Sequence, residues 1–454
     1  MTNCARDRVL VLGLAASGEA AARLLAKEGA DVLGIDQADT DQLRRVADAL
    51  ERDGIRVRLG CALPPRESWT LAVVSPGVRA DSPAVRELVG WGIPVISELE
   101  LGWSRAKGRT LAITGSNGKS TLTALLAAVF QAAGLRTVPA GNFGTPVSRV
   151  VLEQPDWDWL VLEVSSFQLE TVSRFRPDIG ILLNVLPNHL DRHGDFDAYR
   201  AIKFRLFRRM QNGDLGVVPE GLMGDRRRQQ TAPHRWVSFG ASPEADYRYE
   251  PGRIAIKNRH DGSIRTLELS GTYFDNDVLG LAAAAAWAAA DAAGLSPDAL
   301  ARALREFRPL PHRLQEVISS RGVRFVDDSK ATNLAAMLAA LRMTPVPIRL
   351  IAGGLPKHES FEPAIPLLRE RVRGVYLIGA SASDMEAAWG DIVPCRQFSN
   401  LAAAVQAAWA EARAGDTILL APGCASFDQF RSFEDRGEQF ANLARTLATA
   451  SLSP

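Results

Sequence analysis

A glycine-rich segment, Thr114–Thr121 (TGSNGKST), constrains the fold of this chain more than any other feature. It lies between an apolar run, Thr110–Ile113, that predicts a strand and an amphipathic pattern that predicts a helix over about Lys119–Ala133. The glycines let backbone N–H groups approach phosphate oxygens, Lys119 supplies a positive charge, and Ser120 offers Mg²⁺ a hydroxyl. The segment therefore predicts an ATP-binding α/β domain, but GTPases, kinases and transporters share such loops, so the reaction stays open.

The rest of the chain alternates short apolar runs with helical patterns, which is typical of parallel sheets flanked by helices. A chain of 454 residues is too long for one ordinary core. We predict an α/β fold of three domains: a Rossmann-like domain over 1–107, a central P-loop ATPase-like domain over 108–309, and a Rossmann-like domain over 310–454. Further strands are predicted at Arg8–Leu12, Asp31–Ile35, Thr70–Val74, Pro94–Ile96, Trp159–Val164, Asp178–Asn184, Val323–Asp327, Ile348–Ile351, Val375–Ile378 and Thr417–Leu420, and helices at Glu19–Gly29 and Asp197–Met210.

Composition excludes several classes of protein. The formal net charge is +1, from 53 basic and 52 acidic residues, so we expect no nucleic-acid partner. The most lipid-like stretch, Leu279–Leu295, is mostly alanine, contains Asp291 and is short for a bilayer span, so it predicts a buried helix. The polar segment Met1–Arg8 lacks the apolar core of a signal peptide, and the four cysteines are scattered without metal-binding spacing. We expect a cytoplasmic protein without membrane insertion.

A second glycine-rich turn, Gly13–Gly18, follows the first predicted strand, and Asp36 lies at the end of the next one. This pattern resembles a dinucleotide-binding fingerprint and taken alone suggests NAD. However, Ala15 replaces the middle glycine, and no group of residues for hydride transfer follows. The same strand–turn–helix unit can bind other pyrophosphate-containing ligands, so the residues alone leave the ligand open.

Six segments resemble, in the same order, motifs of the Mur ligase family, the ATP-dependent amide-forming enzymes that build the peptidoglycan stem peptide. They are GSNGKST from Gly115, EVSSFQLE from Glu163, NHLDRHG from Asn188, LPHR from Leu310, DSKATN from Asp328 and PGCASFDQF from Pro422. The match runs over essentially the whole chain. The combination of SSFQLE with CASFDQF is most similar to the members that add D-glutamate.

The resemblance implies a reaction and its ligands. These enzymes transfer the γ-phosphoryl group of ATP to a substrate carboxylate and then join an amino acid to the resulting acyl phosphate. For this chain the resemblance implies UDP-N-acetylmuramoyl-L-alanine as acceptor, glutamate as the added amino acid, ATP, and two Mg²⁺ ions. It also implies a CO₂-derived carbamate on Lys203, which turns a cation into an anionic oxygen ligand. We expect a monomer.

The resemblance also assigns residues to these ligands. Four are implied to act in catalysis, namely Lys119, Glu163, His189 and Lys203, and the metal ligands are Ser120, Glu163, His189 and carbamylated Lys203. ATP is expected to contact Gly115, Ser116, Asn117, Gly118, Lys119, Ser120, Thr121, Arg313, Asp328 and Lys330. The UDP group is expected at Ala16, Ser17, Gln37 and Ser75, and the muramoyl part at Asn142, Ser165 and Gln168. Glutamate is expected at Thr332, Lys357, Ser426 and Phe433.

Each of these residues also has an ordinary structural interpretation. Lys203 could be a solvated lysine on its helix, Glu163 could cap a turn, and His189 could be a hydrogen-bonded core histidine. Ser426 and Phe433 could serve helix capping and core packing. The motif context favours the functional interpretation of Lys203. For Glu163 and His189, their expected placement at the C-terminal ends of strands next to the phosphate loop favours it.

Other functions stay open at this stage. Asp275 and Leu279 stand where family members carry a histidine and a second asparagine, which leaves the adenine contact open, whereas Asn276 matches the first family asparagine. Lys357, near the expected amino-acid pocket, lacks the glycine that often follows it. One alternative is therefore an L-glutamate-adding variant of the same step. Others are another Mur ligase step, a folylpolyglutamate-synthase-like ligase, and a nucleotide-binding regulator without turnover.

Overall fold

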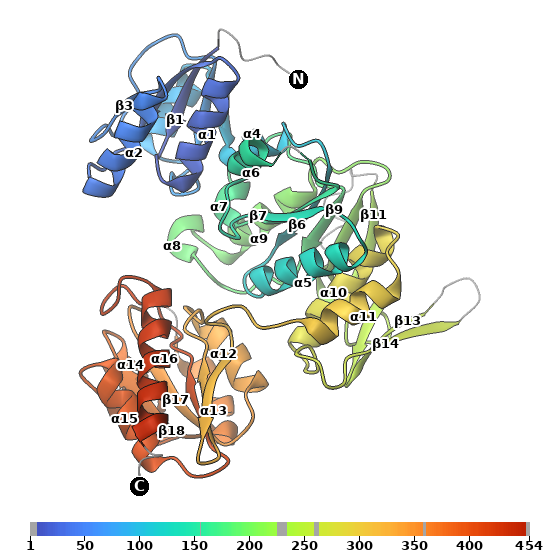
Figure 1. Cartoon of the computed structure of the whole chain (residues 1–454), viewed down its shortest axis with the longest axis vertical. Coiled ribbons are helices and arrows are strands. Elements are labelled where there is room, and N and C mark those ends of the chain that lie inside the picture. The colour runs from blue at the N-terminus through green and yellow to red at the C-terminus, as the bar shows by residue number, and fades with distance from the viewer. Residues whose placement is uncertain (1–6, 155, 225–233, 258–262, 357–359, 451–454) are drawn as a thin grey trace. The chain divides into compact units, whose positions relative to one another are not determined.

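The structure is a computed structural model that describes all residues except 1–6, 155, 225–233, 258–262, 357–359 and 451–454. Three sheets follow one another along the chain (Figure 1). The chain forms two compact units: Met1–Thr272 with Gly280–Phe307 contains the first two sheets, and Tyr273–Leu279 with Arg308–Pro454 contains the third. The predicted α/β class with three sheets is confirmed, whereas the domain boundaries after residues 107 and 309 stay predictions.

The first sheet has five parallel strands in the order β3-β2-β1-β4-β5. Its central strands are apolar and buried, because helices cover both faces of a doubly wound sheet. The first predicted helix begins earlier than expected, at Ala16, because the turn after β1 is tight. The elements are β1 Arg8–Leu12, α1 Ala16–Lys27, β2 Asp31–Ile35, α2 Asp41–Arg52, β3 Arg56–Arg58, β4 Leu71–Val74, α3 Pro83–Gly90, β5 Val95–Ser97 and α4 Glu98–Trp103.

The second sheet has nine strands in the order β14-β13-β12-β11-β10-β9-β6-β8-β7. Its β6, which precedes the phosphate loop, lies between β8 and β9, and all three strands run parallel. The elements up to the loop after β9 are β6 Arg109–Thr114, α5 Lys119–Ala132, β7 Thr137–Gly141, α6 Val147–Glu153, β8 Trp159–Glu163, α7 Ser166–Leu169, β9 Ile179–Leu182 and α8 Leu190–His193. They are followed by α9 Phe196–Phe204, η1 Arg205–Phe207, β10 Leu215–Pro219, η2 Glu220–Leu222, β11 Arg235–Gly240, β12 Tyr247–Glu250, β13 Arg253–Lys257, β14 Ile264–Glu268, α10 Leu279–Ala292 and α11 Pro297–Glu306.

Two predictions for this sheet need correction. The helix expected over Asp197–Met210 ends at Phe204 and continues only as the short 3-10 turn η1, and the strand expected over Asp178–Asn184 is limited to β9. The strand β7 was not predicted, because Pro139 and Gly141 weaken its strand pattern. The alanine-rich helix α10 is buried, as expected, and none of the described helices is long and apolar enough to cross a bilayer.

The third sheet has six strands in the order β15-β16-β20-β17-β18-β19, and only β15 is antiparallel to its neighbour. Its two faces carry separate apolar clusters, one centred on Trp389 and Leu350 and the other on Phe325 and Phe440. The elements are β15 Gln315–Ser320, β16 Val323–Asp327, α12 Leu334–Met343, β17 Ile348–Gly353, η4 Glu362–Ala364, α13 Ile365–Arg371, β18 Val372–Ile378, α14 Ala382–Trp389, β19 Cys395–Gln397, α15 Leu401–Glu411, β20 Thr417–Leu420 and α16 Phe433–Ala450.

The turn between β1 and α1 gives a test of this fold. A Cβ atom at Gly18 would lie 1.8 Å from the carbonyl oxygen of Gly13, which is backbone and cannot move aside cheaply. We expect Gly18→Ala to lower the free energy of unfolding by about 1–3 kcal/mol in urea denaturation. The control is Gly90→Ala at the end of α3, where a Cβ would meet nothing within 4 Å and φ is not positive. Equal stability of both variants would contradict the close approach.

Candidate active site

The phosphate loop connects β6 to α5, as the sequence predicts. Gly118 has φ +81°, a left-handed conformation that glycine adopts without strain, and it places Lys119 at the first position of α5. The ammonium of Lys119 donates to the carbonyl oxygens of Gly115 at 2.9 Å and Ser116 at 3.0 Å. The loop thus brings a positive side chain and a helix N-terminus to one place, which suits a phosphate group.

A residue that the sequence analysis missed, Asn184, holds this loop in shape. Its side-chain oxygen accepts hydrogen bonds from the backbone N–H groups of Ser116 and Asn117, both at 3.0 Å, and its amide nitrogen donates to the Asn117 carbonyl at 3.0 Å. The hydroxyl of Ser116 also donates to the Leu186 carbonyl at 2.9 Å and lies 3.1 Å from the Tyr199 hydroxyl. The only signal in the sequence is a polar residue two positions after the buried strand β9.

Lys203 lies beside the phosphate loop, and its side chain is buried. It is 1% exposed, and its amine donates to the Gly115 carbonyl at 2.8 Å. Burial, reinforced by the nearby charge of Lys119, holds the pKa of Lys203 well below its usual value, and Glu163 opposes the shift. The interpretation of Lys203 as a solvated helix lysine is therefore wrong.

Glu163 ends β8 next to β6, where Ile113 is its partner in the register. The carboxylate is 3% exposed, and Asn142 donates to its Oε1 at 2.7 Å. Its other oxygen, Oε2, is buried and has no hydrogen-bond partner in the part of the chain that the structure describes. A buried carboxylate oxygen without a partner fits a divalent cation, and Ser120 on α5 adds the hydroxyl oxygen that Mg²⁺ also accepts.

His189 lies in the loop after β9 rather than at the end of a strand, which corrects the prediction that placed it there. Its backbone is left-handed, with φ 56°. Its ring packs edge-on against the Phe167 ring, and the two ring centres are 4.8 Å apart. No group of three or more His, Cys, Asp or Glu side chains converges on a metal-binding arrangement among the described residues.

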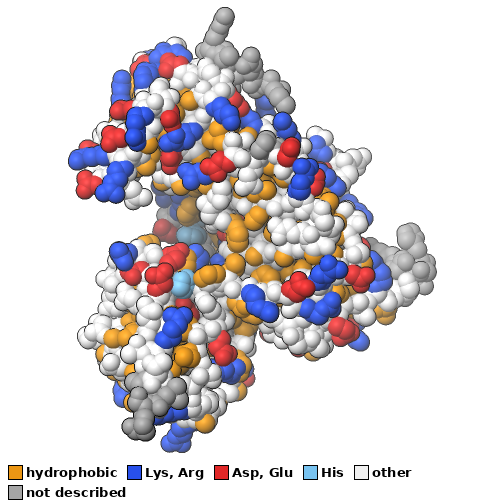
Figure 2. Space-filling view, in the orientation of Figure 1, with side chains coloured by type: hydrophobic (Ala, Val, Ile, Leu, Met, Phe, Trp, Pro, Cys, Tyr) orange, Lys and Arg blue, Asp and Glu red, His pale blue; other side chains and the backbone are white. Residues whose placement is uncertain are grey.

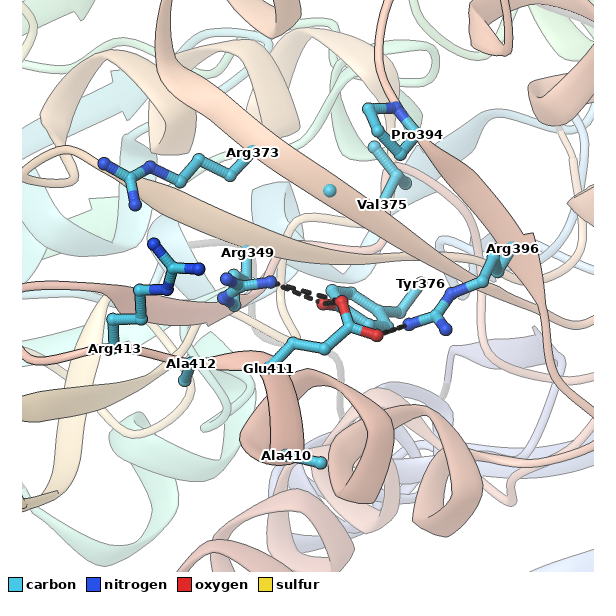
Figure 3. A pocket seen from close by; sticks show the side chains of 11 residues that line it. Arg349, Arg373, Val375, Tyr376, Pro394, Arg396, Ala410, Glu411, Ala412 and Arg413 are labelled. Atoms are coloured by element: carbon cyan, nitrogen blue, oxygen red, sulfur yellow. Dashed lines mark hydrogen bonds and ion pairs between the residues drawn. The ribbon is translucent and has the colours of Figure 1, made fainter.

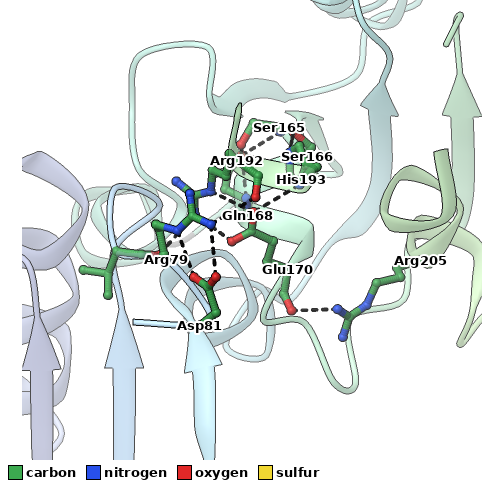
Figure 4. Close-up of polar contacts among 10 residues, drawn as sticks. Arg79, Asp81, Ser165, Ser166, Gln168, Glu170, Arg192, His193 and Arg205 are labelled. Atoms are coloured by element: carbon green, nitrogen blue, oxygen red, sulfur yellow. Dashed lines mark hydrogen bonds and ion pairs between the residues drawn. The ribbon is translucent and has the colours of Figure 1, made fainter. Parts of the chain in front are cut away.

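Arg192, His193 and Glu170 form a polar network close to His189 in the sequence, and Figure 4 shows these three side chains. Arg192 pairs with Glu170 through two bonds of 2.6 and 2.8 Å, and both side chains are less than one-tenth exposed. The Arg192 guanidinium lies 3.9 Å from the Phe167 ring centre and donates to the Val78 carbonyl at 3.2 Å. Arg192 therefore ties the loop after β4 and the ring of Phe167 to the segment that carries His189.

His193 belongs to the same network. Its Nε2 lies 3.0 Å from the Ser166 hydroxyl, and its Nδ1 lies 3.4 Å from Glu170. Burial lowers the pKa of His193, with the charge of Glu170 opposing this shift. The roles of Arg192, His193 and Glu170 were not predicted, although all three belong to motifs.

Asp36 and Ser75 hold the turn after β1 in shape. The Asp36 carboxylate accepts the backbone N–H groups of Leu14 at 2.8 Å and Ala38 at 2.9 Å, so it serves the turn itself. The hydroxyl of Ser75 is also bound internally, since it donates to the Gly13 carbonyl at 2.7 Å.

The other predicted acceptor residues differ in exposure. Ala16 and Gln37 are exposed near the turn after β1, and Ser17 is half-buried there. The Gln168 side-chain oxygen accepts from the backbone N–H of Ser165 at 2.9 Å and completes a capping box on α7. The substrate contacts assigned to these residues, Ser75 and Asn142 stay predictions.

The second compact unit brings Lys330 of the DSKATN motif next to Phe433, the first residue of α16. The Lys330 ammonium lies 3.5 Å from the ring centre of Phe433. Asp328 is nearly buried after β16 and accepts the Leu314 N–H at 3.1 Å, and burial raises its pKa to about 7. The Tyr273 hydroxyl donates to the Arg313 carbonyl at 3.4 Å.

The remaining glutamate-site residues have different surroundings. Thr332 is half-buried, and Ser426 is buried after β20. Lys357 lies outside the described residues.

A fully buried arginine, Arg436 on α16, joins two of the three motifs of this unit, and the sequence analysis did not single it out. It donates to the Ser329 hydroxyl at 3.0 Å, to the Ser329 carbonyl at 2.9 Å and to the Cys424 carbonyl at 3.2 Å. Burial lowers the pKa of Arg436 to about 10. The guanidinium therefore holds the DSKATN loop against the CASFDQF loop.

Comparisons with known proteins agree with this arrangement. Residues 113–281 match the Mur ligase middle domain, and residues 312–424 match the Mur ligase glutamate ligase domain. The UDP-N-acetylmuramoylalanine–D-glutamate ligase of Acidobacterium capsulatum is 39% identical over 96% of this chain and 95% of its own length. The enzyme of the same name from Gloeobacter violaceus is also 39% identical, over 97% of this chain and 99% of its own length.

Solved structures show the same fold at lower identity. A MurF ligase of Thermotoga maritima in complex with ADP has a TM-score of 0.63 at 17% identity, covering 99% of this chain and 100% of that one. A MurC ligase from the same organism has a TM-score of 0.59 at 17% identity, covering 97% and 99%.

The fold and the site define a P-loop nucleotide-binding α/β protein with a buried lysine and a buried carboxylate beside the loop. At 39% identity over almost its whole length, the chain belongs to the Mur ligase family.

The buried pair of Arg192 and Glu170 gives a test of this site. We expect Arg192→Lys to lower the free energy of unfolding by about 2 kcal/mol, because lysine keeps the charge but cannot bind both carboxylate oxygens or stack on Phe167. Urea denaturation measures the change. In the control, Arg44→Lys alters an exposed arginine–carboxylate pair on α2 and should leave the unfolding curve unchanged. Unchanged stability of the Arg192 variant would show that the pair does not fix this segment.

Proposed function

We propose that this chain is an ADP-forming ligase that adds D-glutamate to UDP-N-acetylmuramoyl-L-alanine in peptidoglycan synthesis. The observation that carries the proposal is its 37–40% identity, over at least 96% of its length, to enzymes named UDP-N-acetylmuramoylalanine–D-glutamate ligase. The site agrees with an ATP-dependent reaction, because the phosphate loop, Lys203 and Glu163 lie together in one compact unit.

The chemistry follows from the poor reactivity of a carboxylate. Transfer of the γ-phosphoryl group of ATP to the acceptor carboxylate creates an acyl phosphate and ADP. The amine of D-glutamate then attacks the acyl carbon, phosphate leaves, and the amine loses a proton as the amide forms. Lys119 and the N-terminus of α5 offset the phosphate charge during the first step.

Glu163 and Ser120 would hold Mg²⁺, with His189 as a candidate ligand of a second ion. Such ions supply positive charge that reduces the repulsion between phosphate oxygens and the acceptor carboxylate. The Oε2 of Glu163, which has no hydrogen-bond partner among the described residues, supports this assignment. Asn142 orients the same carboxylate by donating to its Oε1.

A carbamate on Lys203 would give this site a second anionic group besides Glu163. CO₂ reacts with a neutral amine, and the lowered pKa of Lys203 keeps its amine neutral over a wider pH range. Carbamylation would also replace a second amine beside Lys119 by an anion, which removes repulsion between like charges. The bound form should therefore increase with the concentration of bicarbonate.

The second unit supplies the other ligand contacts. Arg313, Asp328 and Lys330 are assigned to ATP, and Thr332, Lys357, Ser426 and Phe433 to glutamate. The contact between Lys330 and Phe433 supports the proposal that the residues assigned to ATP and those assigned to glutamate lie next to each other. Asn276 keeps the family asparagine, and its side chain accepts the backbone N–H groups of Val278 and Leu279, so it shapes the start of α10.

We further propose that the protein acts in the cytoplasm as a monomer with domain boundaries near residues 107 and 309. The alternatives are an L-glutamate-adding variant, another Mur ligase step, a folylpolyglutamate-synthase-like ligase and a silent regulator. The near full-length similarity to enzymes named for D-glutamate favours the proposed reaction over each of them.

A coupled assay of phosphate release tests the reaction. With UDP-N-acetylmuramoyl-L-alanine, ATP and Mg²⁺, we expect release that depends on D-glutamate and an amide product confirmed by mass spectrometry. Reactions with L-glutamate, or without the acceptor, serve as controls. Turnover with L-glutamate alone would identify the variant step, and absence of product with either enantiomer would overturn the proposal.

Native mass spectrometry tests the carbamate on Lys203. In saturating bicarbonate we expect the intact protein to gain the mass of one CO₂, and Lys203→Ala to lose this gain together with ligase activity. Lys257→Ala, which removes an exposed lysine at the end of β13, should keep both. An unmodified wild-type protein together with an active Lys203→Ala variant would overturn the assignment.

A further inference from the structure

Four arginines line a pocket of about 670 Å³ beside the third sheet (Figure 3). Arg349 is the second residue of β17 and Arg373 the second residue of β18, whereas Arg396 lies on β19 and Arg413 follows α15. The DSKATN and CASFDQF loops follow the carboxyl ends of β16 and β20. Because these strands are parallel, the pocket lies at their amino-terminal ends, and the motif loops lie at their carboxyl ends.

Arg349 has the most complete set of partners in this pocket. Its side chain is 9% exposed and donates to Asp416 at 2.8 Å and to the Tyr376 hydroxyl at 2.8 Å, with Glu411 at 3.3 Å. Arg396 also pairs with Glu411. Two carboxylates thus face four guanidinium groups, which leaves an excess of two positive charges in the pocket.

Arg373 and Arg413 account for this excess. Arg373 is half exposed and comes no closer than 3.7 Å to Asp416, a carboxylate that Arg349 already binds. The Arg413 side chain has no carboxylate partner among the described residues, although its backbone N–H donates to Asp416 at 3.1 Å. Figure 3 shows both guanidinium groups on the same side of Glu411 as Arg349. The negative end of α15, at Glu411, can account for one nearby cation but not for this cluster.

Gly374, between Arg373 and Val375, keeps the pocket open. Its φ is not positive, so the backbone does not require glycine there. A Cβ atom would meet the Tyr376 hydroxyl at 3.6 Å and the Pro394 carbonyl at 3.9 Å, which are ordinary contacts. Glycine weakens the interior of a strand and often marks a place where a ligand approaches. The free space in front of Gly374 is therefore available to a bound group.

We propose that this arginine pocket binds a small ligand that carries one or two phosphate groups, at a site separate from the phosphate loop. Guanidinium groups bind phosphate oxygens in pairs, and a pocket of this size accommodates a diphosphate or a nucleotide. A phosphate also relieves the repulsion between Arg373 and Arg413. The site joins β17, β18, β19 and the segment before β20, and it uses no residue of the proposed reaction.

Isothermal titration calorimetry with inorganic pyrophosphate tests the site. The full chain is first saturated with ADP, with free Mg²⁺ in excess over pyrophosphate, so that the phosphate loop is filled. We expect saturable binding to the wild type and at least about tenfold weaker binding to the double variant Arg373→Gln, Arg413→Gln. Gly374→Val should weaken binding similarly, because it fills the pocket while every arginine stays.

The matched control is the double variant Arg369→Gln, Arg445→Gln, which removes two exposed arginines of the same unit outside the pocket. It should bind pyrophosphate as the wild type does, and ADP binding reports that each variant is folded. Absence of saturable binding to the wild type would overturn the site. Equal binding of pyrophosphate by all variants would show nonspecific electrostatic attraction and overturn the site. Tighter binding of hexaglutamate than of pyrophosphate would assign the pocket to acidic peptides instead.

Discussion

Two amines share one backbone carbonyl at the centre of the first compact unit. Lys119 and Lys203 both donate to the oxygen of Gly115, at 2.9 and 2.8 Å, although Lys203 is almost completely buried. Two ammonium groups in such a place repel each other, and burial penalises the charge of the inner one. The site therefore favours an anion, whether phosphate at the loop, the carboxylate of Glu163 or a carbamate on Lys203.

Each sheet uses a polar side chain to hold the loop that follows a parallel strand. Asp36 accepts two N–H groups of the first sheet's turns, Asn184 accepts two from the phosphate loop, and Arg436 donates to the carbonyls of two loops in the third sheet. Loops at the carboxyl ends of parallel strands have backbone N–H and C=O groups that form no hydrogen bonds within the sheet. A side chain that binds several of them fixes the loop without closing the space in front of it.

The fold was largely predictable, because short apolar runs between glycines and helical patterns reveal buried parallel strands. The strands that were missed contain residues that obscure the pattern, such as Pro139 and Gly141 in β7. The end of α9 was placed too late, since Arg205–Phe207 continues the helical pattern as a 3-10 turn. The candidate site could be located from its motifs, but the partners of those motif residues could not.

The sequence by itself determined the phosphate loop, the α/β class and the order of the motifs, because each of these is a local pattern within a few turns of chain. The tertiary structure decided that Lys203 is buried against a carbonyl 88 positions away and that four arginines from separate segments share a pocket. It also decided that one oxygen of Glu163 has no hydrogen-bond partner in the described part of the chain. The physical reason is that the burial of a side chain and the charges around it depend on which distant segments pack together when parallel strands align. A local sequence pattern does not specify those contacts.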